Sequence, residues 1–150
     1  MVSIVVNREN IQYQMNLFYL ATLQEYGQGT EITLQNGKVI VLLKSDKEYD
    51  HFSQVIIKAL KGGYPVGLAI SEDNKILAAE RADNDFVRDI IPRGRETFEV
   101  WFQGHDGIFK LYRSHPRLDK IYTILDRSRI EHKRIWFVSQ RPGLEIVDAI

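Results

Sequence analysis

One order of sequence patterns occurs twice in this chain, and this repetition restricts its fold more than any other feature. In each half, two β-rich runs flank a turn, a helix-like segment follows, and two further β-rich runs come after it. A shift of 69 residues places Phe52 on Ile121 and aligns the flanking patterns. We interpret the pattern as two ββαββ units, residues 31–82 and 97–150, related by a pseudo-two-fold axis.

Turn and capping residues mark the boundaries inside each unit. Asn36-Gly37 suits the positive φ angles of a tight hairpin turn, and Asp106-Gly107 takes the same place in the second unit. We therefore expect the sequence GHDG at a hairpin tip. Apolar residues at helical spacing follow a capping serine in both units, and they predict helices over residues 46–61 and 115–128.

Residues outside the two units are expected to add one helix and one linker. Ile11, Met15 and Phe18 recur at helical spacing, which predicts an N-terminal helical segment within residues 1–30. Residues 83–96 have the Pro and Gly content of a linker between the units.

Together these patterns predict a single α+β domain over residues 1–150. The two ββαββ units would form one curved or barrel-like antiparallel sheet, because hairpin-like pairs favour antiparallel order. The two central helices would pack on this sheet, and the N-terminal helix would cover another part of it.

The composition is that of a globular chain with no overall charge. Hydrophobic residues make up 44% and charged residues 27%, and 20 Lys and Arg balance 20 Asp and Glu. No global field therefore draws the chain to nucleic acid or to a membrane. The chain has no cysteine, which excludes disulfides and thiolate chemistry. Since no signal-like or membrane-spanning apolar run is present, we expect a cytoplasmic protein that does not bind membranes.

Side-chain alternation divides the second hairpin into two faces. We expect Trp101, Lys110 and Tyr112 on the face of the hairpin that points away from the helices, which we call the outer face. With a turn at Asp106-Gly107, Trp101 would lie across from Tyr112 and Gln103 across from Lys110. The apolar residues that we expect to face the helices are Phe98, Val100, Phe102, Phe109 and Leu111.

Two interpretations of the outer face stay open. Aromatic rings beside a lysine are typical of a base-stacking platform for single-stranded nucleic acid. Residues 107–135 hold eight Lys or Arg and three Asp or Glu, and these cations could contact phosphates. Alternatively, the N-terminal helix or a second subunit covers the face, and the rings pack in a core or dimer contact. The candidate binding residues are Trp101, Lys110, Tyr112, Arg113, Arg117 and Lys120.

The sequence offers little support for catalysis. His105 and Asp106 are neighbours in the chain, so their side chains do not easily meet, and no nucleophile accompanies them. The four histidines lack the spacing of a metal site. We therefore predict no catalytic residue, no metal site and no cofactor.

The leading hypothesis for function is a non-catalytic binding or interaction protein. It would act as a homodimer through a sheet face and the basic helix region. The first alternative is a single-stranded nucleic-acid-binding module that uses the candidate binding residues. The second alternative is a small hydrolase or nuclease centred on His105, Asp106 and His115.

Overall fold

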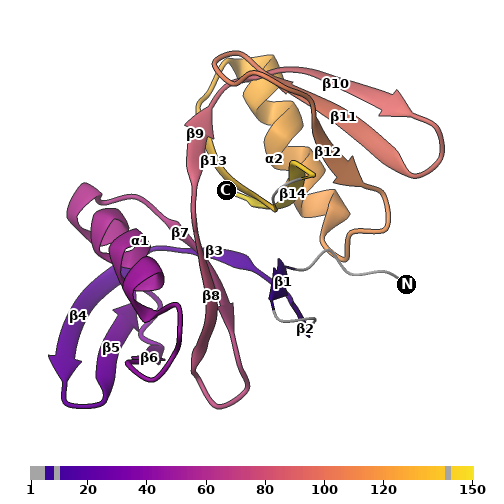
Figure 1. Cartoon of the computed structure of the whole chain (residues 1–150). Helices are drawn as coiled ribbons and strands as arrows, with labels where there is room; N and C mark the ends of the chain where they lie inside the picture. Colours follow the sequence, from indigo (N-terminus) through magenta and orange to yellow (C-terminus); the bar gives the residue numbers. More distant parts are fainter. Residues whose placement is uncertain (1–5, 9–10, 141–142) are drawn as a thin grey trace. The chain divides into compact units, whose positions relative to one another are not determined.

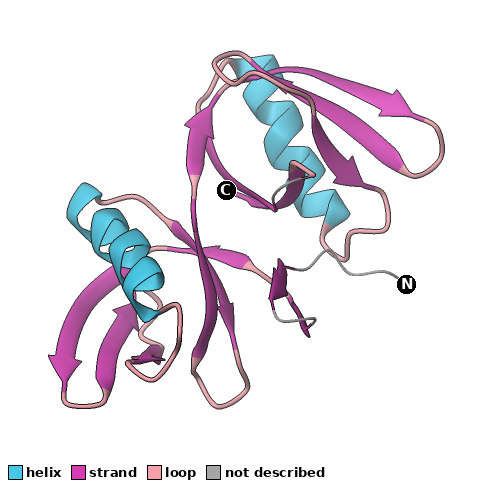
Figure 2. Ribbon diagram, viewed as in Figure 1, coloured by secondary structure: helices cyan, strands magenta, loops and turns pink. Residues whose placement is uncertain are grey.

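Strands in curled sheets make up most of the α+β structure, as the computed structural model shows (Figure 1, Figure 2). Among the residues that it describes, the helices are α1 (Tyr49–Gly62) and α2 (Leu118–Glu131). Neither of them, within the described part of the chain, is long and apolar enough to cross a membrane. The described residues are 6–8, 11–140 and 143–150.

The chain divides into two compact units with one helix each. We call Val6–Ala82 the first unit and Asp83–Ile150 the second unit. Both have the same order of elements from β3 and β9 onward, namely four strands, a helix and two strands. The predicted ββαββ order is therefore part of a longer order in each unit, and its interpretation as a tandem repeat stays a prediction.

Three groups of strands form the first unit. An isolated parallel bridge joins Val41 to Lys75, directly before β8. The groups are the hairpin of β1 (Val6–Arg8) and β2 (Ile11–Tyr13), the sheet of β4 (Leu20–Tyr26), β5 (Gly29–Leu34) and β6 (Val39–Leu43), and the sheet in the order β3 (Asn16–Phe18), β7 (Val66–Ile70), β8 (Ile76–Arg81).

One six-stranded sheet forms the second unit. β12 and β14 are parallel neighbours that meet at Lys110 and Glu145, and the other neighbouring strands are antiparallel. The strand order is β10 (Val87–Arg93), β11 (Thr97–Phe102), β12 (Phe109–Tyr112), β14 (Glu145–Ala149), β13 (Ile135–Gln140) and β9 (Asp83–Asp85).

Each helix buries one face against the strands of its own unit. The buried residues are spaced three or four positions apart, which places them on one side of a helix. They are Phe52, Ile56 and Ala59 in α1 and Ile121, Leu125 and Ser128 in α2. Figure 1 shows α2 lying along the curled sheet of the second unit, where it packs on a core that includes Val100, Phe109 and Phe137. The two predicted central helices therefore form, each starting three residues later than expected.

The predicted N-terminal helix is wrong. Residues 16–18 form β3, and residues 20–26 form β4 and pair with β5 through a turn at Gly27. Met15 and Leu17 are buried and alternate with more exposed neighbours, so the period is that of a strand. Pairing with β5 and β7 decides the structure here and overrides the helical spacing of Ile11, Met15 and Phe18.

The stretch 83–96, expected as a linker, contains β9 and β10 of the second sheet. Pro92 lies in β10, which is an edge strand, and an edge tolerates the missing backbone donor of proline. The expected single antiparallel sheet is replaced by separate sheets, one of which contains the parallel neighbours β12 and β14.

Candidate functional site

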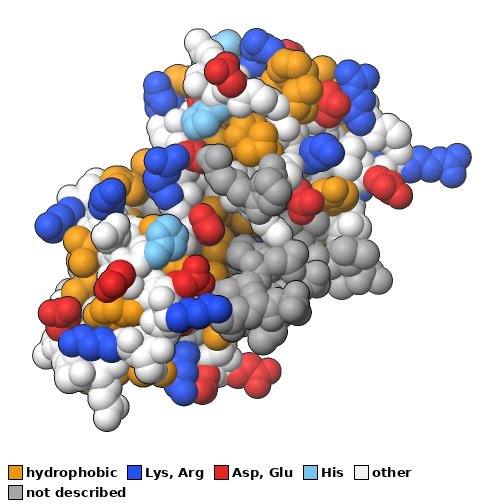
Figure 3. Space-filling model, viewed as in Figure 1, with side chains coloured by type: hydrophobic (Ala, Val, Ile, Leu, Met, Phe, Trp, Pro, Cys, Tyr) orange, Lys and Arg blue, Asp and Glu red, His pale blue; other side chains and the backbone are white. Residues whose placement is uncertain are grey.

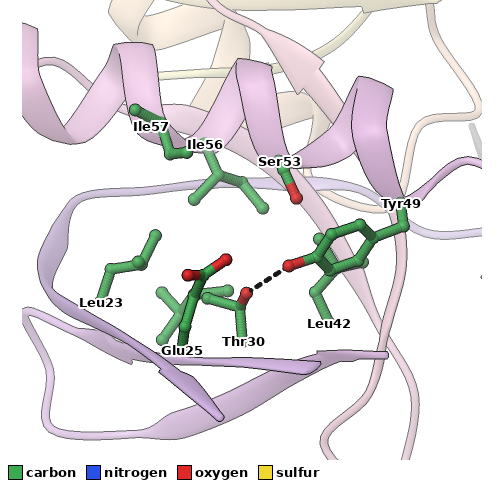
Figure 4. A pocket seen from close by; sticks show the side chains of 9 residues that line it. Leu23, Glu25, Thr30, Leu42, Tyr49, Ser53, Ile56 and Ile57 are labelled. Atoms are coloured by element: carbon green, nitrogen blue, oxygen red, sulfur yellow. Dashed lines mark hydrogen bonds between the residues drawn. The ribbon is translucent and has the colours of Figure 1, made fainter. Parts of the chain in front are cut away.

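A pocket of about 400 Å³ lies in the first unit, between α1 and the sheet of β4, β5 and β6. Figure 4 shows the α1 side chains on one side of it and those of the strands on the other. Ile32, Leu42 and Ile56 are buried at its walls, whereas Ile57 is partly exposed. The residues that line it are Leu23, Glu25, Thr30, Ile32, Leu42, Tyr49, Ser53, Ile56 and Ile57.

The small side chains Thr30 and Ser53 explain why the pocket is open. Thr30 pairs with Leu42 in the first unit, and Phe98 pairs with Leu111 in the second, at corresponding places of the two hairpins. Ser53 is the fifth residue of α1, and Tyr122 is the fifth residue of α2. The second unit therefore has two aromatic rings where the first unit has two hydroxyl-bearing side chains.

The rings of Phe98 and Tyr122 fill the corresponding space in the second unit. Their centroids lie 5.1 Å apart, and both rings pack against the buried core. The guanidinium of Arg113 covers the Phe98 ring, with its carbon 4.4 Å from the ring centroid. One unit thus has a packed site and the other a pocket, although their elements follow the same order.

Four polar side chains face the pocket. Thr30 Oγ1 and the Tyr49 hydroxyl form a hydrogen bond of 2.8 Å (Figure 4). Ser53 Oγ is buried and has no hydrogen-bond partner among the described residues. The exposed Glu25 pairs across the strands with Thr30, so that its carboxylate lies at the pocket mouth. Sequence reasoning missed all four of these residues.

The predicted alternation of the second hairpin is confirmed. Phe109 and Leu111 are 2% and 0% exposed, whereas Lys110 is exposed. The predicted register is wrong, because Tyr112 pairs with Thr97 and Lys110 pairs with Glu99. A long loop replaces the expected two-residue turn and shifts the pairing.

Trp101 and Tyr112 therefore do not face each other across the hairpin. Trp101 pairs with Asp89 of β10, and the Arg88 guanidinium carbon lies 5.2 Å from its ring centroid. The charge of Glu145, burial and a hydrogen bond to Glu145 raise the pKa of the Tyr112 hydroxyl above its usual value. Tyr112 thus belongs to a carboxylate-bearing part of the surface.

The predicted cations are separated into different local environments. Lys110 is the register partner of both Glu99 and Glu145. Arg117 Nη1 and Lys120 Nζ lie 2.9 and 3.5 Å from Oδ1 of Asp148, which is 1% exposed.

Arg113 covers Phe98, as described above. The structure therefore brings Arg117 and Lys120 together but does not place them beside Trp101. On the face in Figure 3, Lys and Arg are interspersed with Asp and Glu.

His105 contacts Asp85 and not its neighbour Asp106. Its Nδ1 lies 2.5 Å from Asp85 Oδ2, and its Nε2 lies 3.7 Å from Asp83 Oδ1. Asp85 also accepts the backbone N–H groups of Phe86 and Gly104, at 2.7 and 2.8 Å. Burial alone would raise the pKa of Asp85, but these three hydrogen bonds outweigh it and hold the pKa below its usual value.

The Asp85 contacts explain the long loop of the second hairpin. Gly104 and His105 are both tied to a carboxylate on β9, so the chain turns after them. The His105 ring also packs edge-on against Phe102, Phe109 and Phe137, at centroid distances of 5.6 to 6.1 Å. No sequence pattern predicted the contact of His105 with Asp85, because Asp85 lies 20 residues before it in a stretch expected to be a linker.

His115 is buried and has a structural role. Burial lowers its pKa below the usual value, which favours the neutral ring. Its Nδ1 accepts the backbone N–H of Arg117, and Nε2 donates to the carbonyl of Val147, each at 2.9 Å. His105 and His115 thus contact different elements.

Neither a metal site nor a similarity to known proteins assigns a function to the described residues. Within the described ranges, no three His, Cys, Asp or Glu residues are grouped as a metal site would require. Comparisons of the chain with protein-family models, with curated proteins and with solved structures found no match.

Proposed function

We propose that this protein is a non-catalytic binding protein whose first unit takes a small ligand with an apolar body. The main observation behind this proposal is that Thr30 and Ser53 leave a pocket in the first unit, whereas Phe98 and Tyr122 fill the corresponding space in the second. The pocket volume of about 400 Å³ is in the range of small-molecule sites. Its aliphatic walls with a few polar groups are also typical of such sites.

The polar groups of the pocket favour binding over catalysis. The hydroxyls of Thr30 and Tyr49 bond to each other, so neither is paired with a base that would activate it as a nucleophile. His105 and His115, the histidines of the hydrolase alternative, hold a loop and a helix start by their hydrogen bonds. These contacts support a structural role for both rings.

We also propose that the two units are copies of one structural plan. α1 and α2 have 14 residues each, and their start positions differ by 69. Asp46 Oδ1 accepts the N–H of Glu48, and His115 Nδ1 accepts the N–H of Arg117, at the same shift. The strand irregularity after Ala69 likewise corresponds to the one after Val138. Repeated details of this kind support duplication more strongly than amphipathic periodicity does.

Association through the outer sheet face is a proposal with less support. A second copy of the chain or single-stranded nucleic acid would contact Trp101, Lys110 and Tyr112 there. Lys110 lies between Glu99 and Glu145 in the sheet, and these carboxylates would repel phosphates. A cytoplasmic location likewise stays a proposal from the composition.

The pocket proposal is tested by titrating the chain with phenethyl alcohol, a neutral apolar probe. Spectra of isotope-labelled Leu and Ile methyl groups should show shifts at Leu23, Leu42, Ile56 and Ile57. A triple variant, Thr30→Phe with Tyr49→Leu and Ser53→Tyr, gives the first unit the side chains of the second. We expect it to lose these shifts. The single variant Ser53→Tyr serves if the triple variant does not fold.

The matched control is Thr33→Trp. Thr33 lies on the opposite face of β5 from the pocket, and its counterpart in the second unit is Trp101, because each is the first residue paired after the irregularity in β4 or β10. This variant adds a ring without filling the pocket, so it should bind phenethyl alcohol like the natural chain. Absence of methyl shifts in the natural chain, or equal binding by the filled variant, would overturn the proposal.

A further inference from the structure

The polar atoms that line the first-unit pocket are all oxygens. They belong to the carboxylate of Glu25 and to the hydroxyls of Thr30, Tyr49 and Ser53. Among the described residues, no Lys, Arg, His, Asn or Gln side chain lines it. The pocket is therefore rich in hydrogen-bond acceptors, and its only charged lining group is an anion.

The hydroxyl arrangement leaves acceptor capacity toward a ligand. One hydrogen is used in the bond between Thr30 and Tyr49, whose oxygens keep lone pairs. Ser53 Oγ is buried without a partner among the described residues, which is costly unless a bound group satisfies it. The carboxylate of Glu25 can only accept when it is ionised. A ligand head with several N–H donors would satisfy the acceptor oxygens of this set.

The residues that flank Tyr49 in the sequence carry a net negative charge, the same sign as Glu25. Asp46, Glu48 and Asp50 precede or follow Tyr49 closely, and Lys47 is the one cation within residues 46–50. A cationic head is therefore favoured at the mouth, and an anionic head is repelled. The aliphatic walls formed by Leu23, Ile32 and Ile57 favour a ligand whose remaining part is apolar.

We infer that the first-unit pocket selects a primary or secondary amine with a compact apolar body. The ammonium group lies between Glu25 and Ser53 Oγ, and the apolar body lies between α1 and the sheet. This inference rests on the proposed binding function and adds the chemical class of the ligand.

The experiment compares three probes of similar size on the full chain. They are phenethylamine, phenethyl alcohol and phenylacetate, which carry a cationic, a neutral and an anionic head. We expect the amine to bind about fivefold more tightly than the alcohol, the effect of one exposed charge pair. We expect the anion to bind most weakly. The preference for the amine should shrink as salt is added, because Glu25 is exposed.

Two variants assign the preference to the carboxylate of Glu25. Glu25→Gln keeps the size of the side chain but removes its charge, so the amine and the alcohol should then bind about equally. The control is Glu31→Gln on the neighbouring strand. Glu31 is an exposed carboxylate next to Thr30 in the sequence, and it lies on the other face of β5. This variant should keep the preference for the amine.

The outcomes separate the inference from the proposed function. Binding of the alcohol at the pocket methyl groups with no preference for the amine, or a preference for phenylacetate, would overturn the amine inference and leave the pocket proposal standing. An amine preference that persists in Glu25→Gln would also overturn it. Failure of all three probes to shift the methyl groups would overturn both.

Discussion

At the scale of single residues, Asp85 shows how one buried carboxylate organises a loop. It is 3% exposed and accepts hydrogen bonds from His105 and from two backbone N–H groups. The backbone donors of Phe86 and Gly104 would lose their acceptor if the carboxylate were removed. The carboxylate of Asp106, which is adjacent to His105 in the sequence, is exposed.

We predict that Asp85→Asn lowers the free energy of unfolding by about 2 kcal/mol at neutral pH, as expected for lost hydrogen bonds to a buried charge. The lowered pKa of Asp85 adds a pH dependence. A carboxylate whose pKa is lower in the folded state stabilises the fold fully above its unfolded pKa, which is about 3.9, and less as the pH falls through its folded pKa.

The difference between the natural chain and Asp85→Asn should therefore be large at neutral pH and shrink below about pH 4. Urea denaturation over a pH series measures it. Asp106→Asn is the control and should change the free energy of unfolding by less than about 0.5 kcal/mol, because it is an exposed site. Equal effects of the two substitutions would contradict the organising role of Asp85.

At the scale of elements, periodicity predicted the two central helices and the face of each strand in the second hairpin. These are local properties, and the inward positions of Phe109 and Leu111 follow from them. The N-terminal strands and the register of the hairpin could not be predicted in this way. They depend on the pairing of β3 with β7 and on the contact between His105 and Asp85, which join residues far apart in sequence.

The candidate site could not be predicted from the sequence either, because the pocket depends on contacts between a helix and a sheet. Thr30 and Ser53 are ordinary residues of a strand and a helix. The one available signal was the comparison of the two halves, in which the shift of 69 residues places Tyr122 on Ser53 but Glu99 on Thr30. The correspondence of Thr30 with Phe98 follows only from the strand pairing. Only the structure shows that those rings fill a space between helix and sheet.

The two helices also differ in how they end, and this difference leads to a prediction for α2. The C-cap residue has a positive φ in both, 71° at Gly63 and 52° at His132. A left-handed conformation costs a residue with a Cβ about 1 kcal/mol or more, and glycine avoids this cost but loses some conformational entropy.

We therefore expect His132→Gly to raise the free energy of unfolding by about 0.5 kcal/mol. His132 is exposed, so few contacts are lost with its ring. The reciprocal change Gly63→Ala in α1 should lower the free energy of unfolding by about 1 kcal/mol. Urea denaturation of both variants checks the pair, and a destabilised His132→Gly would show that the imidazole makes a stabilising contact.

At the scale of the whole molecule, two units with the same order of elements differ in how side chains pack between the helix and the sheet. The second unit fills the space between helix and sheet with aromatic rings and has an intact core there. The first unit leaves an open pocket with polar groups. A packed core stabilises the fold, whereas a pocket lowers stability unless a ligand fills it.

This contrast predicts the effect of opening the second unit. Phe98→Thr together with Tyr122→Ser gives it the small side chains of the first unit. The double variant should lower the free energy of unfolding by about 3 kcal/mol, because it removes packed aromatic surface and the Arg113 contact with Phe98. Phenethyl alcohol should restore part of this loss, since a ligand that binds only the folded state stabilises it.

The control for this prediction is Phe98→Tyr with Tyr122→Phe, which keeps two rings in the site and moves one hydroxyl. It should lose much less stability than the opened variant and should gain no more from phenethyl alcohol than the natural chain does. Urea denaturation with and without the alcohol measures all three proteins. If the opened variant gains nothing from the alcohol beyond the natural chain, its site has collapsed. The open pocket of the first unit would then depend on more than the small size of Thr30 and Ser53, with the Tyr49 hydroxyl and Glu25 as the next residues to exchange.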